Sequence, residues 1–461
     1  MSTTTNQDGA APGGIATMIR HRRVLVASLA GTTIEFYDFY IYATAASLLF
    51  GPLFFPAESK SAQLMLSFAT IALAFIARPL GAAVFGHYGD RVGRKSTLVA
   101  SLMLMGGSTF LIAFLPTYAM VGWVAPLLLC TLRFGQGFGL GGEWGGAALL
   151  AVENAPSGWR ARFGMMPQLG APLGYIAANG LFLTLGLWLS DEEFVAWGWR
   201  LPFVASALLV IVGLWVRLKL GETQEFRAAL EAEPPAAVPL AELLTRHVRA
   251  TLAGTLGAVA CFGLFYICTA FALSYMAGSL GLPRTQALAI QLGAIFMMAF
   301  GIILAGWWSD HLSARRVLIA GCAATVVLGF VFGSGFDAAA PAKLFAILAV
   351  ALFIMGFTYG PLGPSLASQS WPLIFLGLAA SLFVMGLVYG PLGSWLTALF
   401  PVEVRYTGAS VAFNVGGILG GAAAPIAAQY LVTTYGIGAV GLYLTAAGAL
   451  SLIGLVWLAR D

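Results

Sequence analysis

The sequence predicts an all-α integral membrane protein with two consecutive helical halves. Hydrophobic residues make up 59% of the 461 residues and charged residues only 9%, whereas a soluble domain typically carries about 25% charged residues. The chain divides into apolar runs of the length that a helix needs to cross a bilayer. A polar stretch with three prolines, residues 220–250, separates these runs into two groups. The bilayer is therefore the expected solvent of this fold.

The order of apolar runs predicts the domain organisation. We expect a disordered cytoplasmic tail over 1–23, an N-terminal six-helix bundle over 24–219, a cytoplasmic linker over 220–250 and a C-terminal helical bundle over 251–461. The expected spans of the first half are 24–52, 62–86, 97–118, 121–150, 163–187 and 201–219. Those of the second half are 251–279, 287–308, 317–336, 344–363, 373–399, 410–431 and 438–459. Six spans, a linker and six or seven more are typical of a transporter built from repeats.

One apolar segment of the second half is duplicated. Residues 344–368 recur 30 positions later, with the shared core FxxLAxxLFxMGxxYGPLG. A thirteenth complete span would move Arg405 and Arg460 to the opposite side of the membrane. We therefore expect twelve complete spans, with 344–368 re-entrant, peripheral or replacing a neighbouring run.

Lysine and arginine predict the orientation, because cytoplasmic loops carry an excess of both. With twelve spans and the N-terminus inside, seventeen of the 23 basic residues fall on the inner side and two, Arg78 and Arg133, lie within spans. The outer segments hold only Lys60, Arg200, Arg284 and Lys343. Both termini are therefore expected in the cytoplasm. The expected location is the cell membrane, in bacteria the inner membrane, with the chain as a multi-pass protein.

Several function classes find no support in the sequence. The four cysteines lie in apolar runs without CxxC spacing, no HExxH is present, and no histidine lies in an apolar run. We therefore predict no metal site and no cofactor. The net charge of +4 is small and gives no reason to expect a nucleic-acid partner. The sequence contains no recognisable set of a nucleophile with its base and no nucleotide-binding motif, so we do not expect an enzyme. The expected partners are the lipid bilayer, a small metabolite and protons, with the monomer as the functional unit.

Charged residues at membrane depth mark the candidate site, because each costs about 2.5–3.5 kcal/mol at the centre of a helix. Glu35 and Asp38 lie in the first span, Arg78 in the second, and Arg133 and Glu143 in the fourth. Glu35 and Asp38 are three residues apart and are expected to share a helix face. Two carboxylates in a low dielectric do not both ionise easily, so they should hold a proton as a unit. We predict that these two acids and Glu143 couple transport to protons; the alternative is structural ion pairs that lock the helices.

The arginines are candidates for binding a substrate. Arg133 precedes Gln136 by one helical turn, and a guanidinium presents a planar fork that suits a carboxylate. Arg78 is the second candidate, and the alternative for both is a structural pair with a nearby acid. In the second half, the polar candidates for the cavity wall are Tyr266, Thr269, Tyr389 and Asn414.

Glycines of the fourth span predict close helix packing. Gly137, Gly141 and Gly145 are spaced by four residues and so lie along one helix face. Small residues at this spacing let the backbone of another helix approach closely.

The segment GHYGDRVGRK, residues 86–95, is predicted to be a gating loop between the second and third spans. Its acid can make charge-assisted hydrogen bonds to a helix end or an arginine, and such a latch can hold one conformation and release in another. The predicted gating residues are Gly86, Gly89, Asp90, Arg91, Gly93, Arg94 and Lys95. The segment resembles the signature loop of the major facilitator superfamily. A second copy, GWWSDHLSARR at 306–316, keeps Asp310.

Further motifs resemble the metabolite:proton symporter branch of this superfamily. They are EFYDFYIY at 35–42, ARPLG at 77–81, RFGQGFGLGGEWGGA at 133–147, WGWRLPF at 197–203 and VRYTGASVAFN at 404–414. The resemblance covers roughly residues 24–459. It implies two six-helix bundles around a central cavity and import of a small organic acid or zwitterionic metabolite by proton symport through alternating access. Facilitated diffusion or proton antiport on the same fold, and a membrane sensor, remain the alternatives.

Overall fold

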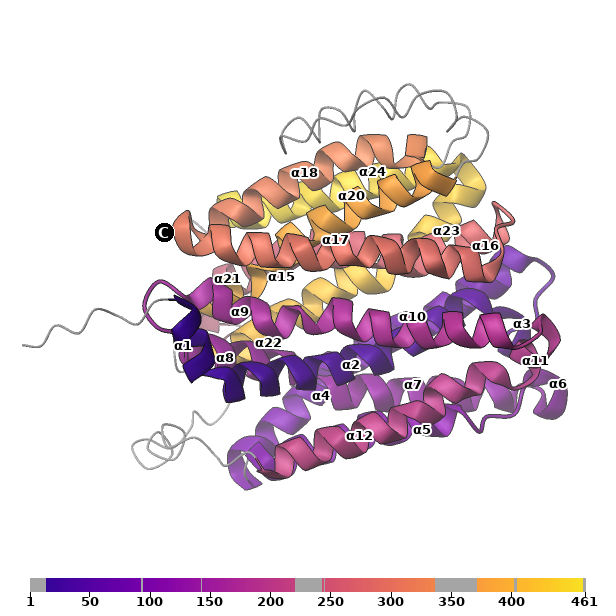
Figure 1. The fold of residues 1–461 in the computed structure, drawn as a ribbon, viewed down its shortest axis with the longest axis horizontal. Helices are drawn as coiled ribbons and strands as arrows, with labels where there is room; N and C mark the ends of the chain where they lie inside the picture. The colour runs from indigo at the N-terminus through magenta and orange to yellow at the C-terminus, as the bar shows by residue number, and fades with distance from the viewer. Residues whose placement is uncertain are drawn as a thin grey trace, which may run out of the picture.

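The structure is a computed structural model in which every described element is a helix (Figure 1). The side chains of residues 86–98 and of Glu143 are not among those described. The described residues are 14–92, 94–141, 143–219, 243, 245–335, 371–401 and 404–458.

The first half of the chain contributes six helical rods, two of which consist of consecutive elements. The rods are α2 (Arg22–Leu48), α4 (Lys60–Val92), α5 (Arg94–Ile112), α7 (Val124–Leu140) with α8 (Glu143–Glu153), α9 (Arg160–Gln168) with α10 (Gly170–Trp188), and α12 (Leu201–Lys219). Short helices precede or connect them: α1 (Gly14–Arg20), α3 (Phe50–Phe54), α6 (Tyr118–Val121), α11 (Asp191–Ala196) and η1 (Gly198–Arg200).

The described part of the second half contributes six more rods, three of which contain a π-helical turn. They are α15 (Val248–Tyr266) with η2 (Ile267–Phe271) and α16 (Ala272–Gly278), α17 (Arg284–His311), α18 (Ala314–Gly335), α20 (Trp371–Tyr389) with α21 (Leu392–Ala398), α22 (Arg405–Gly417) with η5 (Ile418–Ala422) and α23 (Ala423–Tyr435), and α24 (Ile437–Ile453) with η6 (Gly454–Leu458).

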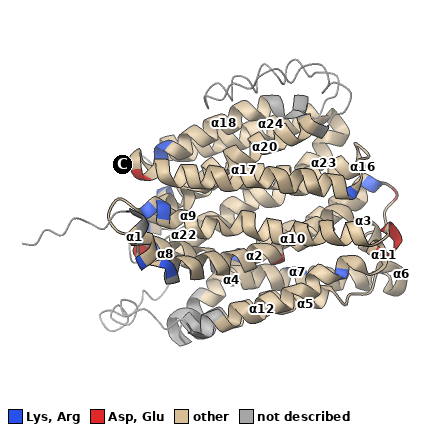
Figure 2. Cartoon of the chain, viewed as in Figure 1, with Lys and Arg blue, Asp and Glu red and all other residues tan. Residues whose placement is uncertain are grey.

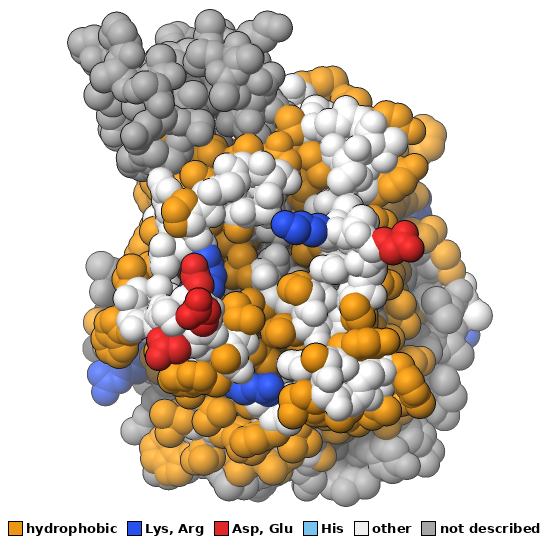
Figure 3. Space-filling view, turned by 90° about the vertical axis from the view of Figure 1, so that its right-hand side faces the viewer, with side chains coloured by type: hydrophobic (Ala, Val, Ile, Leu, Met, Phe, Trp, Pro, Cys, Tyr) orange, Lys and Arg blue, Asp and Glu red, His pale blue; other side chains and the backbone are white. Residues whose placement is uncertain are grey.

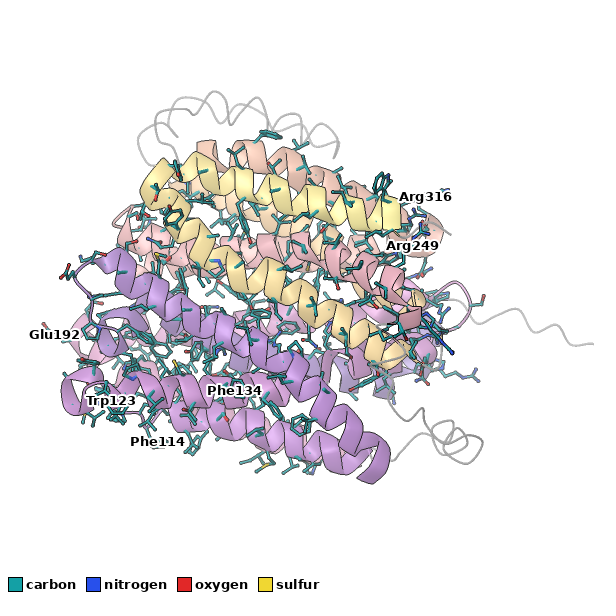
Figure 4. All side chains as sticks on the ribbon, turned by 180° about the vertical axis from the view of Figure 1, so that it is seen from behind. Phe114, Trp123, Phe134, Glu192, Arg249 and Arg316 are labelled. Atoms are coloured by element: carbon teal, nitrogen blue, oxygen red, sulfur yellow. The ribbon has the colours of Figure 1, made fainter. Side chains whose placement is uncertain are left out.

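The rods run side by side along the long axis of the molecule, so the bundle has two distinct ends (Figure 1). We call the end that carries α1 and the C-terminus the proximal end, and the end that carries α3, α6, α11 and α16 the distal end. Arg249 and Arg316 lie at the proximal end and Glu192 at the distal end (Figure 4). Lysine and arginine gather at the proximal end, while the middle of the bundle is almost free of visible charge (Figure 2).

The outer surface of the bundle is apolar, as expected for a protein in lipid. Among the described residues, eight helical segments are long and apolar enough to cross a membrane. Phe114 and Trp123 are exposed by 63% and 68%, and Figure 4 shows them at the periphery of the bundle. The segment Val248–Gly278 is 94% buried over its most apolar window, whereas Gly198–Trp215 is only 39% buried. The seventh rod is therefore central and the sixth is peripheral.

Glycines bring the second and fourth rods together, which confirms the predicted close packing. A Cβ on Gly137 would overlap the backbone carbonyl of Ala74, and one on Gly141 would overlap the carbonyl of Arg78. The backbones of α4 and α7 can approach this closely only because both positions lack a side chain. This contact sets the register of Arg78 on α4 against Arg133 on α7.

Three sequence predictions concern segments at the limits of the described residues. The first copy of the duplication, 344–368, lies outside them; the second copy forms α20 and α21 and packs against α17 and α18. Most of the predicted linker, 220–242, also lies outside. Helix α1 occupies the last part of the tail that was expected to be disordered. Its terminal Arg20 lies in the last turn, where a basic residue stabilises a helix.

Candidate functional site

A small central cavity, with room for about two water molecules, lies between the two halves of the bundle. Most of its wall is aromatic, and Glu35 and Arg78 are the charged side chains among the described residues that line it. The first half contributes Glu35, Phe36, Phe39, Tyr40, Arg78, Trp144 and Ala171. The second half contributes Cys261, Phe262, Phe265, Tyr266, Met385, Tyr389 and Phe413.

The two acids of α2 differ in their position relative to this cavity. Glu35 lines it and is 7% exposed, whereas Asp38 is fully buried and is not part of the wall. The cavity-facing side of α2 also carries Phe36, Phe39 and Tyr40. At about 100° per residue, Asp38 lies beyond the edge of that face and is turned behind the wall. The two acids are therefore neighbours on the helix with different surroundings.

Arg133 lies behind the cavity wall in a fully buried position. Its Nη1 donates a hydrogen bond to Oε1 of Gln136, one turn later on α7. Its guanidinium lies 3.8 Å from the ring centre of Tyr42 and 4.6 Å from that of Phe39. The Nε and Nη2 atoms have no hydrogen-bond partner among the described residues. The role of Arg133 and Gln136 in binding a substrate stays a prediction.

Gln136 ties this buried group to two neighbouring helices. Its Nε2 donates to the backbone carbonyl of Asp38 at 3.1 Å and to Oγ1 of Thr109 at 2.9 Å. The amide orientation is fixed by these bonds, because its oxygen must then face Arg133. Gln136 thereby connects the turn of α2 that carries both acids to Arg133.

Arg78 reaches the cavity wall from α4 and is 8% exposed. Its guanidinium lies 4.6 Å from the ring centre of Phe75 and 4.8 Å from that of Phe39. Its Nε has no hydrogen-bond partner among the described residues. The ring of Phe39 is thus shared by two arginines, one at the cavity and one behind it. An anionic group in the cavity would meet Arg78 first.

The candidates of the second half divide between the cavity and its surroundings. Tyr266 and Tyr389 line the cavity, and the buried hydroxyl of Tyr389 has no hydrogen-bond partner among the described residues. Thr269 donates to the carbonyl of Phe265 and lies outside the wall. Asn414 donates to the carbonyl of Gly141 at 3.1 Å, so it joins the two halves instead of lining the cavity. The side chain of Glu143 lies outside the described residues.

Two residues that the sequence analysis did not select, Trp144 and Gln168, close the proximal side of the cavity. The ring of Trp144 stacks on Phe413 of the other half, with centroids 3.6 Å apart and planes at 1°. Its Nε1 donates to Oε1 of Gln168 at 3.1 Å. Nε2 of Gln168 donates in turn to the carbonyl of Tyr389, also at 3.1 Å. The sequence signal for this contact was a glutamine within an apolar run, and the structure buries it fully.

Asp310 joins the halves at the proximal end. Its carboxylate accepts hydrogen bonds from the backbone N–H groups of Ala161 and Arg162 at 2.8 and 3.1 Å, and from Nε of Arg162 at 2.7 Å. The first N–H groups of a helix lack partners within the helix and carry partial positive charge, so α9 attracts this acid. A gating role for Asp310 stays a prediction. The prediction of a loop over 86–95 was wrong for most of this segment, because α4 continues to Val92 and α5 begins at Arg94. The side chains of these residues lie outside the described residues.

The distal end is closed by contacts of the same kind. Nη2 of Arg284 lies 2.9 Å from Oδ1 of Asp191, at the start of α11. Ser190 and Glu193 fix that start by capping each other's backbone N–H groups. The bonds from Ser190 hold the pKa of Glu193 below its ordinary value.

Deeper in the bundle, the hydroxyl of Tyr175 donates to Oε1 of Gln291 at 2.7 Å. Figure 3 shows few charged side chains on this face.

Comparison with solved structures identifies the architecture. The chain matches the crystal structure of a D-xylose-proton symporter with a TM-score of 0.72 and 16% identity, covering 96% of this chain and 98% of that one. It matches the major facilitator superfamily proton:xylose symporter XylE bound to 6-bromo-6-deoxy-D-glucose with a TM-score of 0.70 and 16% identity, covering 94% of each chain. At this identity the likeness shows the fold, and the predicted fold class is confirmed. The helical bundle therefore has the fold of these major facilitator superfamily symporters.

Sequence comparisons place the chain more closely. The inner membrane metabolite transport protein YhjE of Escherichia coli K12 is 48% identical over 439 residues, which are 94% of this chain and 93% of YhjE. The E. coli shikimate transporter is 34% identical over 424 residues, 92% and 90% of the two chains. The family described as "Sugar (and other) transporter" matches residues 23–237. The chain belongs to the metabolite transporters of the major facilitator superfamily; it is a multi-pass membrane transporter and not an enzyme.

Proposed function

We propose that this protein imports a small organic acid or a zwitterionic metabolite by proton symport, through alternating access of the central cavity. The observation that carries the proposal is that an acid, Glu35, and a base, Arg78, both line a central cavity whose wall is mostly aromatic. The acid can take up a proton, and the guanidinium can hold a carboxylate. The names of relatives support the substrate class: they include a shikimate transporter and, at 29% identity, a proline/betaine transporter of Salmonella typhimurium.

The first step of the proposed cycle is protonation of the α2 acids. While an acid is ionised, it competes with the substrate for the positive charge of Arg78. Protonation removes that competition, and the carboxylate of the substrate can then bind the guanidinium in a low dielectric. Proton binding and substrate binding then favour each other, which is the coupling that symport requires. Asp38 and Arg133 influence this balance from behind the wall, because Phe39 contacts both arginines.

The second step is the exchange of contacts at the two ends. The aromatic wall suits a compact body with few hydroxyl groups, and the cationic part of a zwitterion can lie against aromatic faces. We propose that the proximal end is cytoplasmic, because the basic residues gather there and cytoplasmic segments carry the excess of lysine and arginine. Release to the cytoplasm then requires the Trp144–Phe413 stack and the Asp310–Arg162 pair to separate. Both termini are cytoplasmic in this orientation, the inner membrane is the location, and the monomer suffices.

Uptake into proteoliposomes tests this function. Purified protein is reconstituted, a pH gradient is imposed, and a panel of radiolabelled organic acids and betaines is offered. We expect one member to accumulate only with an inward proton gradient. Glu35→Gln is expected to abolish accumulation while exchange survives, because it removes the carboxylate that takes up the proton and exchange needs no net proton movement. Glu192→Gln, which changes an exposed acid at the distal end, is the matched control.

The arginines provide the second arm of this test. Arg78→Gln should raise the KM for the substrate at least about tenfold, since a lost charge-assisted contact is worth about 1.5–3 kcal/mol. Arg133→Gln should have the smaller effect on KM, because Arg133 lies behind the wall. Equal accumulation with and without the gradient would identify a facilitator, and accumulation driven only by an outward gradient would identify an antiporter.

A further inference from the structure

A second, smaller pocket adjoins the central cavity on its distal side, and we call it the distal pocket. Helix α2 runs from the proximal to the distal end, so its residues 43–47 lie beyond Tyr40 toward the distal end. The pocket has room for about one water molecule. Its wall is formed by Tyr40, Ala43, Thr44, Ser47, Tyr175, Thr269, Ala270 and Leu273, none of which is charged.

The hydroxyl groups of the distal pocket are committed as donors. A hydroxyl has one proton to donate and two lone pairs that accept. Four of the wall residues donate that proton away to other protein atoms, which leaves acceptor lone pairs for a guest. The bonds are Thr44 to Oδ1 of Asn179 at 2.6 Å, Ser47 to the carbonyl of Ala43 at 2.7 Å, Thr269 to the carbonyl of Phe265 at 2.7 Å, and Tyr175 to Oε1 of Gln291 at 2.7 Å. Such a pocket suits a guest that donates hydrogen bonds, as water and hydronium do.

Tyr40 forms the wall between the two cavities and belongs to both. Its ring is held by Phe36, Phe265 and Tyr175, with centroid distances of 5.5, 5.2 and 5.3 Å. A ring fixed in this way keeps its hydroxyl at one place in the wall. Because a phenol hydroxyl both donates and accepts, it can receive a proton on one side and release its own on the other.

We propose that the distal pocket holds the water through which the coupling proton enters, and that Tyr40 relays this proton to the central cavity. The inference rests on the proposed proton symport. In the relay, one O–H bond of hydronium in the distal pocket breaks as a new O–H bond forms at Oη of Tyr40. The original proton of Tyr40 passes to a water in the central cavity and from there to the carboxylate of Glu35. Water, a neutral tyrosine and a neutral carboxylic acid remain.

The groups that face Glu35 leave it as the proton acceptor. Among the described residues, the other titratable side chains in the wall are Tyr40 on α2, Arg78 on α4, Cys261 and Tyr266 on α15, and Tyr389 on α20. Arginine stays protonated, and cysteine and tyrosine side chains ordinarily release a proton only at a pH far above that of a carboxylate. The proton therefore ends on Glu35, and Tyr40 is a positioning residue that carries it there.

Tyr40→Phe tests the relay, because it removes the hydroxyl and keeps the ring packing. The substrate is the panel member that the wild-type protein accumulates most strongly. Loss of a positioned proton-transfer group typically lowers a rate by about a hundredfold or more. We therefore expect proton-driven accumulation to fall by at least about tenfold, which is a conservative threshold for this test. Exchange between substrate pools at equal pH should fall much less than proton-driven accumulation does, because exchange moves no net proton.

Tyr37→Phe is the matched control. Its hydroxyl lies one turn earlier on the same helix, donates to the carbonyl of Pro202 at 2.9 Å and lines neither cavity. This variant should keep its ratio of protons to substrate. Ser47→Ala, which removes acceptor lone pairs from the distal pocket and leaves Tyr40 intact, should also lower proton-driven accumulation.

The possible results separate the relay from the proposed function. A wild-type protein without proton-driven uptake overturns the symport and the relay with it. A coupled wild type together with an equally coupled Tyr40→Phe overturns the relay alone. Uptake driven by a Na⁺ gradient at equal pH, lost in Ser47→Ala and retained in Tyr40→Phe, would make the distal pocket a Na⁺ site and also overturn the relay.

Discussion

Phe39 is the residue at which the two buried arginines meet. Its ring centre lies 4.8 Å from the guanidinium carbon of Arg78 and 4.6 Å from that of Arg133. A cation over an aromatic face gains about 0.5–2 kcal/mol, more where water is excluded. The ring thus compensates part of the cost of holding two positive charges in a low dielectric. A change in the position of either guanidinium must also be accommodated by the ring that touches the other.

Phe39→Leu tests this contribution, because leucine keeps most of the apolar volume and removes the aromatic face. We expect it to lower the thermal midpoint in detergent more than Phe182→Leu does. Phe182 is as fully buried, but its described ring contact is with Phe194, and none of the described arginines lies over it. In a double-mutant cycle, Phe39→Leu and Arg78→Gln should show a coupling of about 0.5–2 kcal/mol. Additive effects would show that the ring fills space and nothing more.

At the scale of elements, α4 and α7 pack closely because glycines at their contact have no side chain. Gly137→Ala should therefore destabilise the fold, because its methyl group would overlap the backbone carbonyl of Ala74, which cannot move as a side chain can. Gly180→Ala is the matched control on α10, where a Cβ meets nothing within 4 Å. There the replacement should be neutral or stabilising by up to about 1 kcal/mol, because alanine loses less backbone entropy in a helix. Thermal midpoints in detergent measure both, and equal effects would contradict the packing argument.

Hydropathy and residue spacing predicted these elements because the bilayer permits few kinds of backbone structure. A chain in lipid must satisfy its backbone within helices, so long apolar runs define the rods to within a few residues. The glycine spacing of the fourth rod likewise predicted a close neighbour. Both features are local in sequence.

The site was less accessible from the sequence, because it depends on how each helix is rotated. Glu35 and Asp38 were expected on one face, yet the cavity faces the side of α2 that includes Phe36 and Tyr40 and leaves Asp38 behind the wall. Gln168 and Trp144 meet only because α8 and α9 pack together. Contacts such as Asn414 with Gly141 join residues of opposite halves, and spacing along the chain carries no information about them.

At the scale of the whole molecule, we expect the contacts at the two ends to determine which side of the cavity opens in the proposed cycle. The proximal pair is well shielded, since the side chains of Arg162 and Asp310 are 17% and 4% exposed. The distal pair is weaker, because the side chain of Asp191 is 92% exposed and water screens it. Each pair joins the two halves, so each should stabilise the state in which its own end is closed.

Cys261 allows this balance to be measured, because it lines the central cavity and is a native cysteine. In a background where Cys130, Cys268 and Cys322 are replaced by alanine, an impermeant thiol reagent is added to one side of oriented vesicles. Arg162→Ala removes charge-assisted hydrogen bonds worth about 1.5–3 kcal/mol in total, which corresponds to a shift of roughly 10- to 150-fold toward proximal opening. Modification of Cys261 should become faster from the proximal side and slower from the distal side.

Arg284→Ala should act in the opposite direction and more weakly, since an exposed pair is worth about 0–1 kcal/mol. If both variants instead speed modification from both sides equally, the pairs stabilise the bundle as a whole and do not select between its two open states.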